Sequence, residues 1–156
     1  MTLISEDRLF PTGGQTRGLS RSLYNSIKGL PILSPHGHCE PSWFSKNKRF
    51  PDPAQLFVVP DHYVFRMLVS QGSTLSELGV SPIDSSDFEK DPKEIWRKFS
   101  ENYCLFRGTP TAMWLDYSFE KVFGISEPLT AGTSEYYYNH IEEKLSQPEY
   151  LPQALF

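Results

Sequence analysis

Residues 30–38 have the sequence Leu-Pro-Ile-Leu-Ser-Pro-His-Gly-His, and this stretch decides the fold that we expect for the chain. The apolar run at residues 30–33 predicts a short buried strand. Pro35 lacks the N–H that a sheet requires, so the strand should end there and the histidines should lie at its end or in the next loop. Barrel enzymes place catalytic groups at the ends of strands, which makes these histidines candidates for a functional site.

The pair His36 and His38 is suited to binding a metal ion. Residues two apart in an extended backbone project to the same side, and Gly37 between them has no side chain to intervene. Imidazole is a common ligand of zinc and similar divalent ions. The alternative is that these are two histidines of an exposed loop, since a His-x-His pattern is short and arises by chance. Cys39 points the other way in an extended chain, which argues against a role as a ligand.

A second group of polar residues lies in the sequence Asp-His-Tyr-Val-Phe-Arg of residues 61–66. His62 and Arg66 are one helical turn apart and Tyr63 precedes Arg66 by three, so the three share one side of a helix. An imidazole, a phenol and a guanidinium together suit a carboxylate and hydroxyl groups, and the first two could transfer protons. The alternative is structural: Asp61 starts a helix, Tyr63 is a core residue and Arg66 pairs with a nearby acid.

The sequence after residue 50 predicts helices and loops. Aspartate or threonine near a proline is typical of a helix start, because the side chain caps the first turn and proline fits within it. Glycine after an apolar stretch is typical of a helix end. The pattern predicts helix starts at Asp52, Asp61, Asp91 and Thr109, a turn capped by Thr74 and Glu77, and helices at residues 19–27 and 134–145.

Two stripes of large apolar residues recur at helical spacing. The first consists of Trp96, Phe99, Tyr103 and Phe106, and the second of Leu115, Phe119, Val122 and Phe123. The first could be a stacking platform for bases or sugars, but this spacing is typical of a helix face packed in a core. We therefore expect both stripes to be core, with Cys104 as a small buried side chain among the aromatic rings.

The composition of the 156-residue chain is that of a folded protein, with 38% apolar, 14% aromatic and 22% charged residues. A net charge of -4 and a single short basic cluster at residues 46–49 argue against a nucleic-acid partner. The apolar runs are far shorter than the ~20 residues that cross a bilayer, so we expect no membrane association. Two cysteines are too few for a disulfide framework and no signal-peptide pattern is present, so we expect a reduced cytoplasmic setting.

Together these segments resemble the amino-terminal part of the uronate (glucuronate) isomerase family, within the amidohydrolase superfamily. The resembling motifs are residues 30–38, residues 61–66, and residues 108–125, which begin with Gly-Thr-Pro and end with Phe-Gly-Ile. Their order and spacing match the family along roughly residues 20–156. Each motif is short, but the ordered set is specific.

The resemblance implies an α/β protein, here the N-terminal part of a metal-dependent (β/α)8 TIM barrel. We accordingly divide the chain into residues 1–40, which hold the N-terminal segment and the first barrel strand, and residues 41–156, a mostly α-helical insertion that leads back toward the barrel. The fragment itself should be mainly α-helical. A lone strand would leave its backbone groups unpaired, so the remaining strands are expected beyond residue 156.

The resemblance also implies an activity, the interconversion of D-glucuronate with D-fructuronate and of D-galacturonate with D-tagaturonate. The partner would thus be a small-molecule hexuronate substrate. His36 and His38 would be ligands of a divalent metal, commonly zinc. His62 and Tyr63, and by extension Arg66, would bind the sugar acid, and Tyr63 would also transfer a proton. We expect the full-length protein to be a homo-oligomer.

Two other interpretations stay open at this point. A metal-dependent hydrolase of the same superfamily would share the histidine pair, and later arginines suited to a uronate carboxylate would favour the isomerase instead. A helical module without catalysis would be monodisperse, melt cooperatively and bind no metal. If the chain is part of an isomerase, it should be inactive alone and should associate through its unpaired strand and exposed apolar faces, because a barrel takes ~250 residues.

Overall fold

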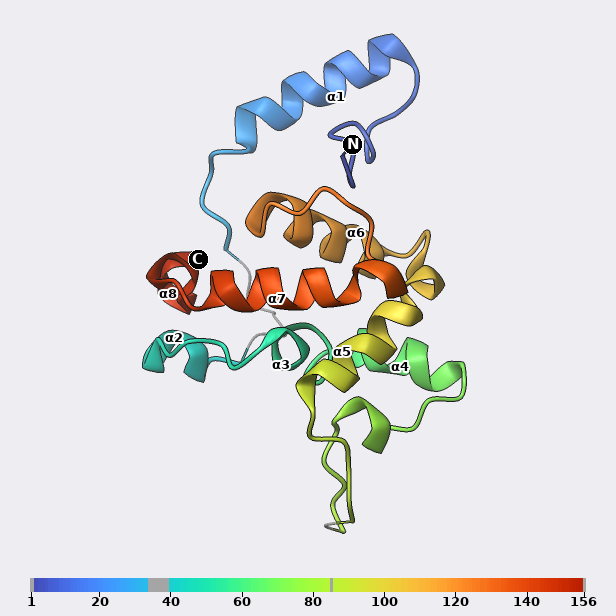
Figure 1. Ribbon diagram of the computed structural model, residues 1–156. Helices are drawn as coiled ribbons and strands as arrows, with labels where there is room; N and C mark the ends of the chain where they lie inside the picture. The colour runs from blue at the N-terminus through green and yellow to red at the C-terminus, as the bar shows by residue number, and fades with distance from the viewer. Residues whose placement is uncertain (1, 34–39, 85, 156) are drawn as a thin grey trace.

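The computed structural model describes residues 2–33, 40–84 and 86–155, and over these residues the protein is helical and has no β-strand (Figure 1). The α-helices are α1 (Gly14–Ile27), α2 (Ser42–Lys46), α3 (Pro53–Phe57), α4 (His62–Ser70), α5 (Pro92–Glu101), α6 (Pro110–Tyr117), α7 (Ser134–Leu145) and α8 (Pro152–Leu155). Shorter turns join them: η1 (Ser76–Leu78), η2 (Tyr103–Phe106), η4 (Ala131–Thr133) and η5 (Pro148–Tyr150), and the π-helical turn η3 (Ser118–Val122). None of the helices in these ranges combines the length and the hydropathy that a membrane-spanning helix requires.

The predicted helix starts are confirmed, because each predicted capping side chain accepts a backbone N–H of its own helix. The pairs are Asp52 with the Gln55 N–H (2.8 Å), Asp61 with Tyr63 (2.8 Å), Asp91 with Lys93 (2.9 Å) and Thr109 with Ala112 (3.2 Å). Each bond satisfies a donor that the first helical turn would otherwise leave without a partner. Helix α7 has the predicted bounds, whereas α1 begins at Gly14 rather than at residue 19.

Aromatic side chains of α5, η3 and α7 form the centre of the core. Trp96 and Phe99 are 1% and 0% exposed, and Phe119 and Tyr137 are both 0% exposed. Trp96 donates its indole N–H to the carbonyl oxygen of Ser134 at 3.0 Å, so its polar atom is paired. Both predicted stripes are therefore core, and the alternative that the first is a stacking platform is wrong.

Ring contacts join the helices into one body around α7. In Figure 1, α6 lies on one side of α7, and α2, α3 and α5 lie on the other. The Trp96 ring on α5 lies 6.4 Å from Phe57 at the end of α3, 6.2 Å from Phe119 in η3 and 6.4 Å from Tyr138 on α7, measured between centroids. One side chain thus connects four elements that lie far apart in the sequence.

The predicted buried strand at residues 30–33 is wrong for the described structure. Leu30, Ile32 and Leu33 are 63%, 91% and 92% exposed and take part in no strand. A strand needs a neighbour to pair with its backbone groups, and no other segment of the described residues supplies one. Cys104 was expected to be buried but is exposed, because α5 ends before it and the tighter turn η2 does not continue the inward-facing spacing.

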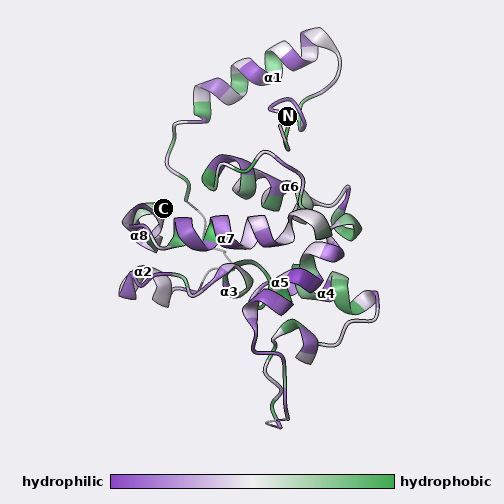
Figure 2. Ribbon diagram, in the orientation of Figure 1, coloured by the Kyte–Doolittle hydropathy of each residue, from purple (hydrophilic) through white to green (hydrophobic). Residues whose placement is uncertain are grey.

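Helix α1 lies apart from this body and buries none of its residues. Its aliphatic side chains Leu19, Leu23 and Ile27 are 62%, 61% and 58% exposed. Apolar residues are coloured green in Figure 2, where they occur along α1 as well as in the helical body. The segment before α1 turns back toward it, and Asp7 pairs with Arg21 at 2.6 Å. The described structure therefore leaves one apolar face of α1 without a partner.

The capping box predicted for Thr74 and Glu77 is confirmed. Thr74 donates its backbone N–H and its hydroxyl to Glu77 Oε2, both at 2.8 Å, and the Glu77 N–H donates to Thr74 Oγ1 at 3.3 Å. The Lys98 ammonium lies 3.3 Å from the other carboxylate oxygen of Glu77. The hydrogen bonds from Thr74, and after them the bond and charge of Lys98, favour the ionised form and lower the pKa of Glu77 to about 2.

Replacing Glu77 with glutamine is expected to remove a pH-dependent part of the stability. A carboxylate whose pKa is lowered on folding stabilises the fold above its unfolded-state pKa of 4.5, and this stabilisation is lost as the pH falls toward 2. Urea unfolding should therefore show a larger difference between the unmodified chain and Glu77→Gln at about pH 7 than at about pH 3. Glu143→Gln, at an exposed position of α7, is the control. A difference that is the same at both pH values would contradict this account.

Candidate functional site

Helix α4 presents the predicted substrate-binding residues at its start. Asp61 caps the helix by accepting the Tyr63 backbone N–H, and this fixes the direction of the first turn. Val64 and Leu68 are 0% and 1% exposed and attach one side of α4 to the core. The Tyr63 side chain is 45% exposed, so the alternative that it is a core residue is wrong. The helix thus has a buried apolar side and a partly exposed side that carries Tyr63.

The rings of His62 and Tyr63 lie against each other, with centroids 4.3 Å apart and planes inclined by 33°. Arg66 is exposed on the next turn of α4 and forms no ion pair with an acid of the described residues. The alternative that Arg66 pairs with a nearby acid therefore finds no support in this part of the chain. The structure brings His62 and Tyr63 together and leaves Arg66 exposed one turn further on.

This arrangement suits a small molecule that carries both hydroxyl groups and a carboxylate. An imidazole next to a phenol can donate and accept hydrogen bonds to hydroxyl groups, and both can transfer protons. A guanidinium binds a carboxylate through two parallel N–H···O bonds. Because the helix is capped and held to the core, the spacing of these groups is set before a ligand arrives.

The predicted metal ligands His36 and His38, like Cys39, lie outside the described residues. Within residues 2–33, 40–84 and 86–155, no group of three or more histidine, cysteine, aspartate or glutamate side chains could hold a metal ion. Two imidazoles suit zinc by their chemistry, but catalytic zinc sites have about three protein ligands and a water. A metal at His36 and His38 would thus need at least one further ligand besides these two imidazoles.

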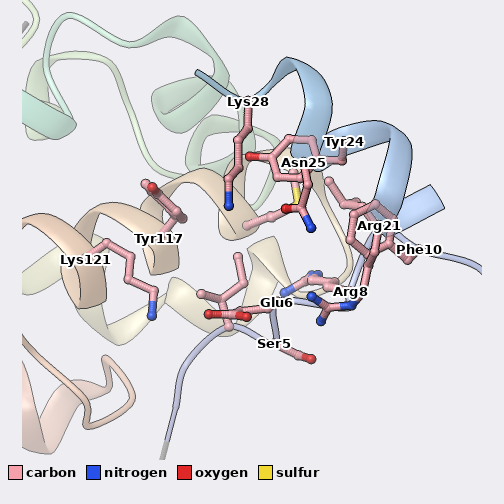
Figure 3. A pocket seen from close by; sticks show the side chains of 13 residues that line it. Ser5, Glu6, Arg8, Phe10, Arg21, Tyr24, Asn25, Lys28, Tyr117 and Lys121 are labelled. Carbon is pink, nitrogen blue, oxygen red and sulfur yellow. The ribbon is translucent and has the colours of Figure 1, made fainter. Parts of the chain in front are cut away.

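A pocket of about 550 Å³ lies between the N-terminal segment, α1, α6 and η3 (Figure 3), and the sequence interpretation missed it. Four cationic side chains take part in its lining: Arg8, Arg21, Lys28 and Lys121. Its walls come from segments that are far apart in the sequence, so no local pattern outlines it. The only sequence signal is the helical spacing of Arg21, Tyr24 and Lys28, which places them on one face of α1.

A half-buried polar pair was also missed. The Tyr103 hydroxyl donates to Asp116 Oδ1 at 2.8 Å and joins η2 to α6. Removal from water raises the pKa of the Asp116 carboxyl and of the Tyr103 hydroxyl, while the charge of Arg8 opposes the shift at both groups. A phenol whose raised pKa keeps it protonated stays a hydrogen-bond donor. This pair is therefore a structural link between η2 and α6.

The chain is similar to proteins of one family over nearly its whole length. The family model described as glucuronate isomerase matches residues 12–156. The uronate isomerase of Rhizobium meliloti (strain 1021) is 55% identical over 154 residues, which make up 99% of this chain and 33% of the relative. The uronate isomerase of Mesorhizobium japonicum is 51% identical over 156 residues, or 100% of this chain and 33% of the relative.

A solved structure has the same arrangement of helices. The crystal structure of glucuronate isomerase from Caulobacter crescentus matches with a TM-score of 0.93 at 45% identity, covering 100% of this chain and 33% of that one. The chain thus spans about a third of the length of these relatives. The motifs at residues 30–38, 61–66 and 108–125 fall within a single match that runs from residue 12 to residue 156. The chain belongs to the glucuronate isomerase family.

Proposed function

We propose that this chain is the part of a uronate isomerase that contacts the sugar acid through α4. The assembled enzyme would interconvert D-glucuronate with D-fructuronate and D-galacturonate with D-tagaturonate. The proposal is carried by the 55% identity, over 99% of the chain, to a protein named uronate isomerase. The same name on the Mesorhizobium japonicum relative favours an isomerase over a hydrolase. In this proposal the rest of the protein completes a (β/α)8 barrel that includes residues 30–33, and the full-length protein is a homo-oligomer.

The proposed reaction moves hydrogen between two neighbouring carbons of the open-chain sugar acid. A base removes the proton from C2 and the C1 carbonyl oxygen gains a proton, which gives an enediol. A proton then returns to C1, the O2 hydroxyl loses its proton, and a ketone forms at C2, so no atom is gained or lost. This chemistry needs a proton-transfer group near both carbons and a group that stabilises the negative charge developing on oxygen.

The side chains of α4 are assigned to separate tasks in this reaction. Tyr63 is the proposed proton-transfer group, because its phenol is exposed and close to a second proton-exchanging ring. His62, 4.3 Å away between centroids, would bind sugar hydroxyls and hold the phenol in place. Arg66 would bind the substrate carboxylate through its guanidinium. The carboxylate would then lie one helical turn from the carbons that exchange hydrogen.

We propose that His36 and His38 hold a divalent metal ion, with zinc as the ion that imidazole ligands commonly bind. When bound, such an ion supplies a Lewis acid for the substrate's oxygen atoms. The described residues hold no complete metal site of their own, so in this proposal His36 and His38 are joined by at least one further ligand.

A chimera in which this chain replaces the matching third of the Rhizobium meliloti enzyme tests the proposed function. The chimera is expected to convert D-glucuronate to D-fructuronate, followed by NMR of the two sugars. The 156-residue chain alone is expected to show no turnover, because a complete barrel needs ~250 residues. A folded chimera without turnover would contradict the assignment, and turnover by the isolated chain would contradict the division of the site between the two parts.

Replacing Tyr63 with phenylalanine in this chimera is expected to lower kcat about a hundredfold, because only the proton-transferring hydroxyl is removed. The cap of α4 should persist, since Asp61 binds the backbone N–H of residue 63 and not its side chain. Tyr136→Phe, at another exposed tyrosine, is the matched control and should keep full kcat. A rise in KM with unchanged kcat would show that Tyr63 binds the substrate and transfers no proton.

A further inference from the structure

The pocket between the N-terminal segment, α1, α6 and η3 has the size of a small-molecule site. Its volume of about 550 Å³ falls within the range of ~300–1,000 Å³ that is usual for ligand pockets. In Figure 3, Asn25 and Lys28 extend from α1 and Lys121 from η3 toward the same space, with Arg8 on the N-terminal segment. His62, Tyr63 and Arg66 are not among the lining residues.

Six of the thirteen residues that line the pocket have aromatic or largely apolar side chains. They include Ile4, Leu9 and Phe10 from the N-terminal segment, Tyr24 from α1, and Met113 and Tyr117 from α6. The rings of Phe10 and Tyr24 meet edge to face at 6.1 Å, and the Arg21 guanidinium lies 5.6 Å from the Phe10 centroid. A ligand with an apolar or aromatic body would therefore find partners on three sides.

Two of the four cations in the lining are not neutralised by the described protein. Arg21 pairs with Asp7 at 2.6 Å, and Lys121 pairs with Glu120 at 2.7 Å. Arg8 and Lys28 form no ion pair with any described residue. The charge of Arg8 does act on Asp116, but the Asp116 carboxylate is already bound by the Tyr103 hydroxyl. The lining thus carries positive charge that a bound anion would neutralise.

Glu6 is the remaining acid of the lining, and it forms no ion pair with Arg8 or Lys28. The hydrogen bond and charge of Glu120, and after them the charge of Glu6, raise the pKa of the Lys121 ammonium. Lys28 is the C-cap residue of α1, and Arg8 lies two residues beyond Glu6 on the N-terminal segment. An anion placed between Arg8 and Lys28 would therefore meet two cations without a matching carboxylate.

The two faces of α1 differ in character. The face turned away from the pocket suits contact with further polypeptide, and the face that lines the pocket does not. Leu23 is two residues from both Arg21 and Asn25, so at ~100° per residue it projects away from the pocket. Leu19 and Ile27 share its face and are also exposed. The relatives are about three times as long as this chain, and this aliphatic face suits the additional polypeptide. Packing polypeptide against Arg8 and Lys28 would instead remove two unpaired cations from water.

We propose that the pocket binds an amphipathic organic anion, with a carboxylate held between Arg8 and Lys28 and an apolar or aromatic body against Phe10, Tyr24 and Tyr117. The carboxylate supplies the acceptors that the two cations lack. The body displaces water from the rings that form the wall. A sugar acid, whose body is covered with hydroxyl groups, matches this wall poorly.

Three probes test the proposal on the unmodified 156-residue chain by titration calorimetry. 2-Naphthoate is expected to bind, and 2-naphthamide, which has the same rings without the charge, should bind about tenfold more weakly or worse. D-Glucuronate, which has the charge without the apolar body, should also bind at least about tenfold more weakly. No binding of 2-naphthoate, or equal binding of the amide, would overturn the proposal. Equal binding of D-glucuronate would overturn the role of the apolar wall.

Substitutions of the two cations test where in the pocket the anion binds. Arg8→Gln and Lys28→Gln should each weaken 2-naphthoate about tenfold while leaving 2-naphthamide unchanged. Arg17→Gln is the matched control, because Arg17 lies one turn before Arg21 on the same helix and outside the lining. Far-UV circular dichroism checks that each variant is folded. Unchanged binding in both pocket variants, or an equal loss in Arg17→Gln, would overturn the assignment of Arg8 and Lys28, and the result does not depend on isomerase activity.

Discussion

Replacing His38 with alanine in the chimera with the Rhizobium meliloti enzyme should lower kcat/KM for D-glucuronate about a thousandfold. His38 is proposed to be one of the two imidazole ligands that this chain contributes to the metal. Lewis-acid stabilisation of a developing oxyanion is worth several kcal/mol, and a loss of ~4 kcal/mol corresponds to about a thousandfold in rate. His36→Ala should have an effect of the same size, because removing either ligand disrupts the same site.

Metal content distinguishes this role from a structural one. Plasma mass spectrometry should find less metal per chain in His38→Ala than in the unmodified chimera, with both proteins equally folded by circular dichroism. His140→Gln is the control, because the His140 Nε2 atom instead lies 2.8 Å from the carbonyl oxygen of Phe123. Full metal content together with full activity in His38→Ala would remove the basis for a metal site at this pair.

The starts of α3, α4, α5 and α6 were predictable because each depends on residues close together in the sequence. Asp52, Asp91 and Thr109 each bind a backbone N–H two or three residues ahead, so the capping signal and its effect lie within one turn. The same holds for the bonds between Thr74 and Glu77. The core assignment followed from the spacing of the aromatic residues, since a helix repeats every 3.6 residues.

The prediction of a strand at residues 30–33 was wrong because a strand depends on a segment elsewhere in the chain. An apolar run shows that a segment prefers burial, but a strand exists only where a second segment receives its hydrogen bonds. The described residues contain no such segment, and Ile32 is 91% exposed. The chain spans about a third of the length of these relatives, and a strand partner for this run stays a prediction.

The arrangement of the proposed site residues was predictable to the extent that they lie on one helix. His62 and Tyr63 share the first turn of α4 and touch, as their positions next to the Asp61 cap suggested. The pocket beside α1 could not be predicted, because Arg8 and Lys121 are brought together by folding and not by sequence spacing. The metal ligands His36 and His38 stay a prediction.

Replacing Trp96 with alanine is expected to destabilise the 156-residue chain by about 3–5 kcal/mol. The indole is 1% exposed, touches rings from α3, η3 and α7, and donates to the Ser134 carbonyl oxygen. Alanine would leave a large cavity in the middle of the core and a backbone acceptor without its partner. Domains of this size are stable by only about 5–15 kcal/mol, so the variant should unfold at a much lower urea concentration, followed by far-UV circular dichroism.

Two companion variants show which property of Trp96 matters. Trp114→Ala makes the same substitution at a position that is 56% exposed and should change the free energy of unfolding by less than about 0.5 kcal/mol. Trp96→Phe keeps an aromatic ring but loses the N–H. Its loss of unfolding free energy should therefore lie between those of Trp114→Ala and Trp96→Ala. If Trp96→Ala were as mild as Trp114→Ala, the aromatic contacts could not be what joins α3, α5 and α7. The position of α4 and its His62–Tyr63 pair would then depend on other packing, because Val64 and Leu68 fix that helix to the same core.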